Sequence, residues 1–296
     1  MLAWSASSIF VRAGHADTLV FTTWRLWFAL PPLAVIVAWR RRRDPQLQIW
    51  PTGMSRARGL VVLVGGGAFF ASGAAAAFAA IDRTRLLDVT LITSLQPVLV
   101  VAFAVAVLGE VLAPGQVALA IVAIVGTIVV AAAASGTVTW TLSGDLIAVV
   151  SLVLNTGWFL YGRVLRSRFA IDPYAAMLGV LFAAAVLLTP VTLIASGTLH
   201  LETRGFAFAA CTMVSGTSAH VFMMWAHRYL PASVSAPFLL AEPPIVALAA
   251  WAVFDEALGI VEIIASLVVI GVLVVVTRSP TLEHVEELAS DPMAPT

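Results

Sequence analysis

The sequence contains no lysine and little charge of either sign. Charged residues make up 11% of its 296 residues, all sixteen basic residues are arginine, and the formal net charge is zero. A soluble domain of this size needs a far more charged surface, so that class of protein is excluded. Because there is no excess of positive charge, we also expect no nucleic-acid partner.

Cysteine and the common catalytic signatures are also scarce. Cys211 is the single cysteine, so it cannot form an intrachain disulfide. The sequence has no Walker pattern, no His-Glu-x-x-His pattern and no cysteine cluster. His220 and His227 are seven residues apart, about two turns along a helix, which is too far to share one metal ion. We therefore expect neither an enzyme nor a metal or other cofactor.

Apolar sequence, in contrast, is abundant. Hydrophobic residues make up 61% of the chain and the mean hydropathy is +1.01. Apolar runs of about 20 residues recur along the chain, and this is the length that a helix needs to cross a bilayer. We predict an all-α integral membrane protein with about ten transmembrane helices, the first of them truncated. The predicted spans are 1–13, 18–39, 59–80, 86–108, 115–134, 144–162, 173–196, 205–226, 231–254 and 258–277.

One local pattern occurs twice within these runs. Gln96-Pro97 and Glu242-Pro243 each place a polar residue before a helix-breaking proline, and they lie 146 residues apart. A polar residue and a proline deep in an apolar segment, once in each half, indicate a transporter with two-fold internal symmetry. We predict a first five-helix repeat over 1–134, a connecting loop over 135–143, a second repeat over 144–277 and a disordered cytoplasmic tail over 278–296.

The arginines of the short loops predict the orientation. If the N-terminus lies in the cytoplasm, eleven arginines fall on the cytoplasmic side and four on the far side, which fits the positive-inside rule. Because each half has an odd number of helices, the two repeats are inverted, as in alternating-access transporters. We predict a multi-pass protein of the cell inner (plasma) membrane with both termini in the cytoplasm. The eleven are Arg40, Arg41, Arg42, Arg43, Arg56, Arg58, Arg163, Arg166, Arg168, Arg228 and Arg278.

Short motifs occur along both halves of the chain. They are Trp24-Arg25-Leu26, Ser94-Leu95-Gln96-Pro97 and Leu108-Gly109-Glu110, then residues 144–148, 226–233, 240–243 and 254–256. Together they resemble the EamA-type carriers of the drug/metabolite transporter superfamily, over essentially the whole chain. The resemblance implies a ten-helix carrier that moves small metabolites, often outward, without ATP. The charged link at 82–88 and the short first span depart from the family pattern.

Glu242 and Gln96 are the first candidates for a solute site, each expected in the middle of its span. An ionised carboxylate at that depth is costly and usually faces a cavity or a partner. Desolvation favours its neutral form, so Glu242 is also the candidate for proton coupling. Symmetry would place Gln96 opposite, where an amide can bind a solute without the cost of a charge. The alternatives are a structural carboxylate at a proline kink and a helix-to-helix hydrogen bond.

Five further candidates lie within the predicted spans: Arg25, Asn155, Trp158, Tyr161 and His220. Arg25 could balance an anionic solute or pair with Glu242, or its long stem could reach the outer interface. The side chains at 155, 158 and 161 share one helix face and could bind a flat or cationic solute, although interfacial belts and ordinary packing are the alternative. His220 lies off a polar and aromatic stripe formed by Ser215, Ser218, Phe222 and Trp225.

The sequence thus predicts a secondary-active transporter that exports or exchanges a small organic metabolite, such as an amino acid, by alternating access. Its partners would be the small-molecule solute and the lipid bilayer, and a homodimer stays open. One alternative is a non-transporting membrane scaffold or receptor, whose polar groups would be satisfied within the protein. Another is a nucleotide-sugar or triose-phosphate type exchanger, which would need more basic residues in its cavity than one arginine.

Overall fold

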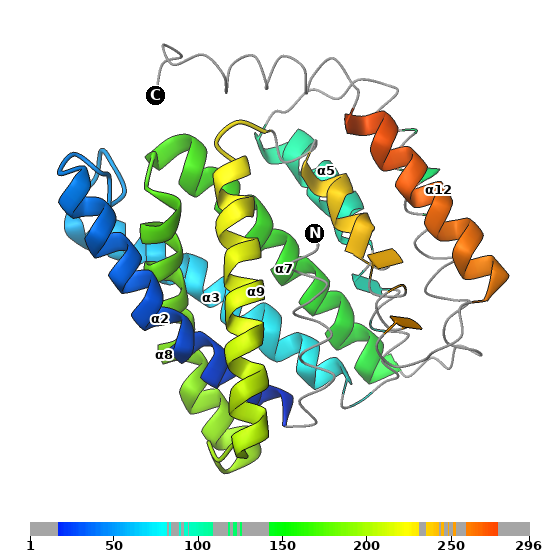
Figure 1. Cartoon of the computed structure of the whole chain (residues 1–296), viewed down its shortest axis with the longest axis horizontal. Helices are drawn as coiled ribbons and strands as arrows, with labels where there is room; N and C mark the ends of the chain where they lie inside the picture. The colour runs from blue at the N-terminus through cyan, green and yellow to red at the C-terminus, as the bar shows by residue number, and fades with distance from the viewer. Residues whose placement is uncertain are drawn as a thin grey trace.

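Helices make up every regular element that the structure describes, which confirms the all-α prediction. The structure, a computed structural model, describes residues 17–81, 83, 89, 92–93, 95–108, 118, 121–122, 125, 142–230, 235–242, 244–245, 248, 251–252 and 259–277. In chain order the elements (Figure 1) are α2 (Thr18–Arg43), α3 (Arg56–Ile81), α5 (Gln96–Leu108), α7 (Leu142–Phe169), α8 (Pro173–Ser196), α9 (Thr203–Ala226), the 3-10 helix η1 (Ala236–Ala241) and α12 (Ile260–Thr277).

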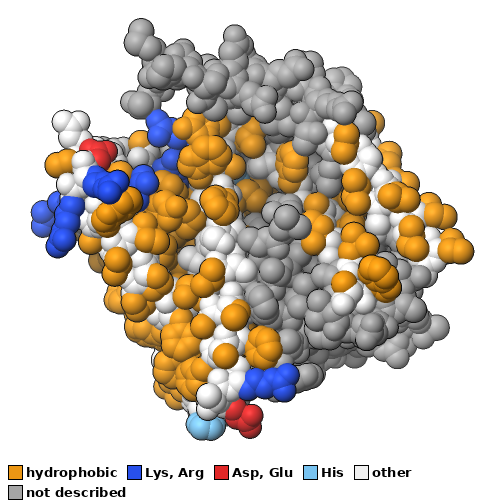
Figure 2. Space-filling view, viewed as in Figure 1, with side chains coloured by type: hydrophobic (Ala, Val, Ile, Leu, Met, Phe, Trp, Pro, Cys, Tyr) orange, Lys and Arg blue, Asp and Glu red, His pale blue; other side chains and the backbone are white. Residues whose placement is uncertain are grey.

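Five of these helices are long and apolar enough to cross a membrane: α2, α3, α7, α8 and α9. Their outward faces are apolar, since Ile194 is 86% exposed and Val61 is 71% exposed. Figure 2 shows a broad apolar surface, with basic side chains at the C-terminal end of α2 and a smaller charged group at the opposite end. Aliphatic surface of this extent matches hydrocarbon better than water.

The ends of α8 follow the local rules that predicted them. The Asp172 side chain accepts hydrogen bonds from the amides of Tyr174 and Ala175, at 3.0 and 3.2 Å, and Pro173 takes the first helical position, where no amide hydrogen is needed. Gly197 ends the helix with a φ of +68°, a left-handed conformation that glycine adopts without a Cβ clash. The predicted span at 173–196 is thus confirmed at both ends.

The two proline-containing segments differ from the predicted continuous spans. The predicted span at 86–108 is broken at Leu95, which lies in a turn and whose carbonyl accepts from the Val98 amide at 3.0 Å. Ile92 and Thr93 before this turn are helical, and α5 begins after it, at Gln96. Pro97 therefore falls in the first turn, where proline is tolerated, and Gln96 lies at a helix start and not in the middle. In the second half, residues 236–241 form a 3-10 helix, and Glu242 lies at its C-terminal cap.

Several predictions fall outside the described residues: the span at 1–13, most of the span at 115–134, the acidic residues Glu110, Asp255 and Glu256, and the tail at 278–296.

The packing of the helices follows a two-fold relation. The helix α3 packs on α7 and α8, α2 packs on α8 and α9, and α5 packs on α7 and η1. The helices α2 and α3 are the second and third predicted spans, and α8 and α9 are the seventh and eighth. In two five-helix repeats, α2 therefore corresponds to α8, and α3 corresponds to α9. The pair α3–α8 thus has its counterpart in the pair α9–α2. The equivalent helices α2 and α8 also touch, through a hydrogen bond of 2.7 Å between the hydroxyl oxygens of Thr23 and Thr192. This exchange of partners is the one that two related repeats produce.

The contact between α3 and α8 depends on a glycine. A Cβ atom added at Gly67 would lie 2.5 Å from the Ala183 Cβ and 2.9 Å from the Ala184 backbone nitrogen. We expect Gly67→Val to lower the free energy of unfolding by about 1–3 kcal/mol, the usual cost of overpacking, as measured in mixed detergent micelles. Gly271→Val is the matched control, because a Cβ at Gly271 meets nothing within 4 Å. Equal stability of the two variants would contradict this account.

Candidate functional site

A cavity between α2, α3, α8 and α9 contains the intramembrane arginine. Arg25 and His220 both line it, and the remaining lining is mostly apolar: Leu26, Ala29, Phe70, Leu181, Gly216 and Thr217. Arg25 therefore faces inward, beside His220, and does not reach for the outer interface. Its guanidinium makes no hydrogen bond and no ion pair with any other described residue, Glu242 included. A cation in such a place calls for a negative partner, because apolar surroundings do not solvate it.

Three rings meet beside this cation. The centroids of Phe70 and Trp158 are 5.4 Å apart with their planes at 90°, and Phe70 lies 5.2 Å from His220. Trp158 and His220 are 6.1 Å apart. Edge-to-face contacts of this kind fix ring positions at low cost. The structure thus joins Trp158 and His220, two predicted residues, through Phe70, which nothing in the sequence distinguished from an ordinary apolar residue.

A second cavity lies between α7 and α9, and His220 lines this one too. The other lining residues are Trp158, Phe159, Gly162, Met223, Met224 and His227. His227 follows directly after α9, is only 1% exposed, and packs its ring 4.7 Å from that of Phe159. Burial, together with the nearby Arg163 and Arg166, lowers the pKa of His227 to about 3, so the imidazole is neutral. In the sequence, His227 stood out only as a member of the 226–233 motif and as a histidine too far from His220 to share a metal ion with it.

Asn155 and Tyr161 belong to the contact between α7 and α3, outside this cluster. The Asn155 amide donates to the carbonyl and hydroxyl oxygens of Ser151, at 3.0 and 3.1 Å. The Tyr161 hydroxyl donates to the Val62 carbonyl at 2.6 Å. Both side chains therefore have partners within the protein, as the packing alternative predicted.

Gln96 begins α5 and Glu242 lies at the C-terminal cap of η1, and these two helices pack against each other. Neither residue lines the two cavities. Of the seven predicted site residues, the structure brings together Arg25, Trp158 and His220. The stripe beside His220 points outward at its aromatic end, since Phe222 is 63% exposed and Trp225 is 53% exposed.

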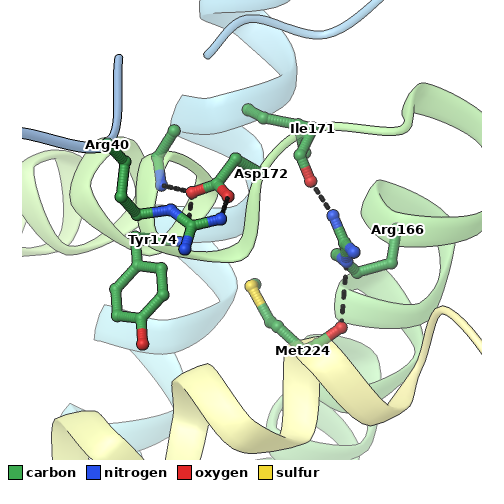
Figure 3. Close-up of polar contacts among 7 residues, drawn as sticks. Arg40, Arg166, Ile171, Asp172, Tyr174 and Met224 are labelled. Atoms are coloured by element: carbon green, nitrogen blue, oxygen red, sulfur yellow. Dashed lines mark hydrogen bonds and ion pairs between the residues drawn. The ribbon is translucent and has the colours of Figure 1, made fainter. Parts of the chain in front are cut away.

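At the arginine-rich end of the bundle, two arginines of α7 donate hydrogen bonds to carbonyls at the end of α9 and in the loop before α8. Arg166 donates from Nε to the Met224 carbonyl at 3.0 Å and from Nη1 to the Ile171 carbonyl (Figure 3). Arg163 donates to the His227 carbonyl. The last carbonyls of a helix have no partner within it, and cationic donors suit them. We call these three contacts the arginine clasp.

A neighbouring ion pair joins α2 to the start of α8. Arg40 Nη2 lies 3.0 Å from Asp172 Oδ2 (Figure 3). The guanidinium carbon of Arg40 lies 5.2 Å from the centre of the Tyr174 ring. Together with the clasp, this pair connects four helices at one end of the molecule: α2, α7, α8 and α9.

The clasp should contribute strongly to stability. Arg166→Met leaves two carbonyls without their donor, and each bond from a charged donor is worth about 1.5–3 kcal/mol. We expect the free energy of unfolding to fall by at least about 2 kcal/mol, measured in mixed micelles. Arg168→Met is the matched control, because Arg168 is exposed at the end of the same helix. Similar losses for the two variants would mean that the clasp contributes little.

Comparison with known proteins gives one family and one fold. The model of the EamA-like transporter family matches residues 1–132 and 142–278. A solved structure, described only as "Crystal structure of protein", superposes with a TM-score of 0.77 over 93% of this chain and 93% of that chain, at 18% sequence identity. At that identity the likeness concerns the fold alone. No curated sequence matches the chain.

Proposed function

The chain belongs to the EamA-like transporter family and is therefore a membrane transporter, and we propose that it exports or exchanges a small organic metabolite by alternating access. The two matched stretches support two repeats, for which we propose the boundaries 1–134 and 144–277. We propose further that the arginine-rich end, with both chain termini, faces the cytoplasm.

The observation that carries the proposal is Arg25 in its cavity, without a negative partner among the described residues. A solute with a carboxylate would supply that partner, and Arg binds a carboxylate through two parallel hydrogen bonds. Thr217 and His220 line the same cavity and can add hydrogen bonds, while Phe70 offers an apolar ring edge. The lining matches the chemistry of a metabolite with one anionic group and an apolar part, as in an amino acid. The cavity has room here for about one water molecule, so it would have to widen to admit such a solute. Phosphorylated solutes would need more cations than the one that lines the cavity.

We propose that Glu242 carries the coupled proton. It caps a 3-10 helix, and irregular backbone at membrane depth is tolerated where it is buried in protein or lines a water-filled cavity. Its counterpart in the other repeat, Gln96, would accompany it as a neutral group and bind solute through its amide. Asn155, Trp158 and Tyr161 would then shape the wall between the two repeats.

The test begins with metabolites in the medium of overexpressing and deletion cells. We expect an anionic or zwitterionic metabolite whose external level follows expression. That compound is then loaded into proteoliposomes, and counterflow of the labelled form is measured with empty liposomes as the control. If no metabolite follows expression under any growth condition, the protein is better described as a scaffold or receptor.

A further inference from the structure

His227 has the unusual combination of deep burial and two unused ring nitrogens. Neither Nδ1 nor Nε2 has a hydrogen-bond partner among the residues that the structure describes. A buried polar atom without a partner costs about 1–3 kcal/mol, so each such atom needs an explanation. Here both atoms belong to one ring that lines the cavity between α7 and α9. The cavity has room for about one water molecule beside them.

The cavity at His227 is linked to the solute cavity by one residue. His220 lines both, with Arg25 on one side and His227 on the other. The two histidines are seven positions apart, which is about 10 Å along a helix. The imidazole rings of His220 and His227 therefore lie one after the other between the solute cavity and the arginine-rich end of the bundle.

His227 is also part of the arginine clasp, because its carbonyl accepts from Arg163. The charged groups that face its ring come from α7, namely Arg163 and Arg166; Arg228, the next residue in the chain, is exposed. On α9 the titratable neighbour along the cavity is His220. All the charges are positive, so they oppose a proton on His227 for as long as the clasp is closed.

We propose that His227 is a proton-binding site of the transport cycle, neutral while the arginine clasp is closed and protonated once the clasp opens and water reaches its ring. The proposal rests on the alternating-access function stated above. It adds a second proton site, at the arginine-rich end of the molecule, to the carboxylate of Glu242.

The sign of the pH effect follows from the two states. With the clasp closed, the pKa of His227 is held at about 3 by burial and by Arg163 and Arg166; a hydrated histidine has a pKa of about 6.5. The proton thus binds the open state more tightly. The closed state is favoured above about pH 6.5 and loses that advantage as the pH falls from about 6.5 towards 3. Acid should open the clasp.

The test measures the distance between α7 and α9 directly. Nitroxide labels are attached to Arg168→Cys and Phe222→Cys, both exposed, in a Cys211→Ser background reconstituted in nanodiscs, and distances are recorded between about pH 8 and about pH 5. We expect a longer distance to gain population in acid, and we expect His227→Gln to abolish that gain. His200→Gln is the matched control, because His200 is exposed and should leave the gain intact.

Two results would overturn the proposal: no acid-dependent gain in the parent protein, or the same gain in His227→Gln. Should His227→Gln fail to fold, Arg163→Gln tests the same idea. It frees the His227 carbonyl and removes a positive neighbour, so the transition should move to higher pH, and an unchanged midpoint would again contradict the proposal. The distance measurement needs no solute. Its failure would leave transport standing, whereas absence of counterflow would remove the transport function and with it the place of His227 in a transport cycle.

Discussion

Arg25→Gln is expected to reduce transport of the anionic metabolite at least about 30-fold. Removing one partner of a buried, hydrogen-bonded charge pair costs about 2–5 kcal/mol, and each 1.4 kcal/mol is a factor of ten. Glutamine retains hydrogen-bonding groups but not the charge. The loss of transport rate would therefore measure the electrostatic part of the binding free energy. The measurement is the initial rate of counterflow in proteoliposomes as a function of solute concentration. The loss should appear mainly as a raised KM, because the contact forms on binding.

Charge and geometry at Arg25 can be separated. Arg25→Lys keeps the positive charge and loses the planar fork that binds both carboxylate oxygens, so its activity should fall between those of the parent protein and Arg25→Gln. Arg204→Gln is the control, since Arg204 is exposed at the first turn of α9.

A matched pair of solutes makes the test at Arg25 sharper. The parent protein should prefer the carboxylate compound over its neutral amide, and Arg25→Gln should lose that preference. If Arg25→Gln still prefers the acid as strongly as the parent protein does, Arg25 does not bind the anionic group.

The second large effect is expected for Glu242→Gln under an imposed pH gradient. One proton per solute across a gradient of about two pH units supports about a hundredfold accumulation, because each unit is worth about 1.4 kcal/mol. Glutamine is close in size to a protonated glutamate but cannot release a proton. Accumulation by Glu242→Gln should therefore fall to the level without a gradient, as measured by uptake into proteoliposomes of defined internal pH.

The control for Glu242 is Glu202→Gln, because Glu202 is exposed before α9. If Glu242→Gln accumulates solute along the pH gradient as well as the parent protein does, the coupling site lies elsewhere. The distance measurement at His227 then decides whether the arginine-rich end holds the proton instead.

The spans were predictable where short-range chemistry fixes them. The bounds of α8 were predictable because Asp172 caps one end and Gly197 ends the other, both through contacts within a few residues. Both polar residues before the prolines Pro97 and Pro243 were predicted in the middle of continuous spans, whereas Gln96 begins α5 and Glu242 lies at the C-terminal cap of η1. Where each interruption falls depends on neighbours: α5 starts at Gln96, and η1 packs against it.

The candidate site was predicted only in part, because residue types do not say which way a side chain faces. His220, predicted to lie off the polar and aromatic stripe of its helix, lines both cavities, while Phe222 and Trp225 of that stripe point outward. Asn155 and Tyr161 have partners on their own helix and on α3, which no spacing within the sequence could reveal.

The sequence by itself determined a helical membrane protein with two repeats, because apolar length, proline position and arginine distribution act through local and bilayer-wide forces. Only the tertiary structure decided which polar groups lack partners. Among the described residues, no carboxylate lines the cavity beside Arg25, and neither ring nitrogen of His227 has a hydrogen-bond partner. The reason is physical: whether a buried polar group is satisfied depends on atoms far away in the chain that packing brings near.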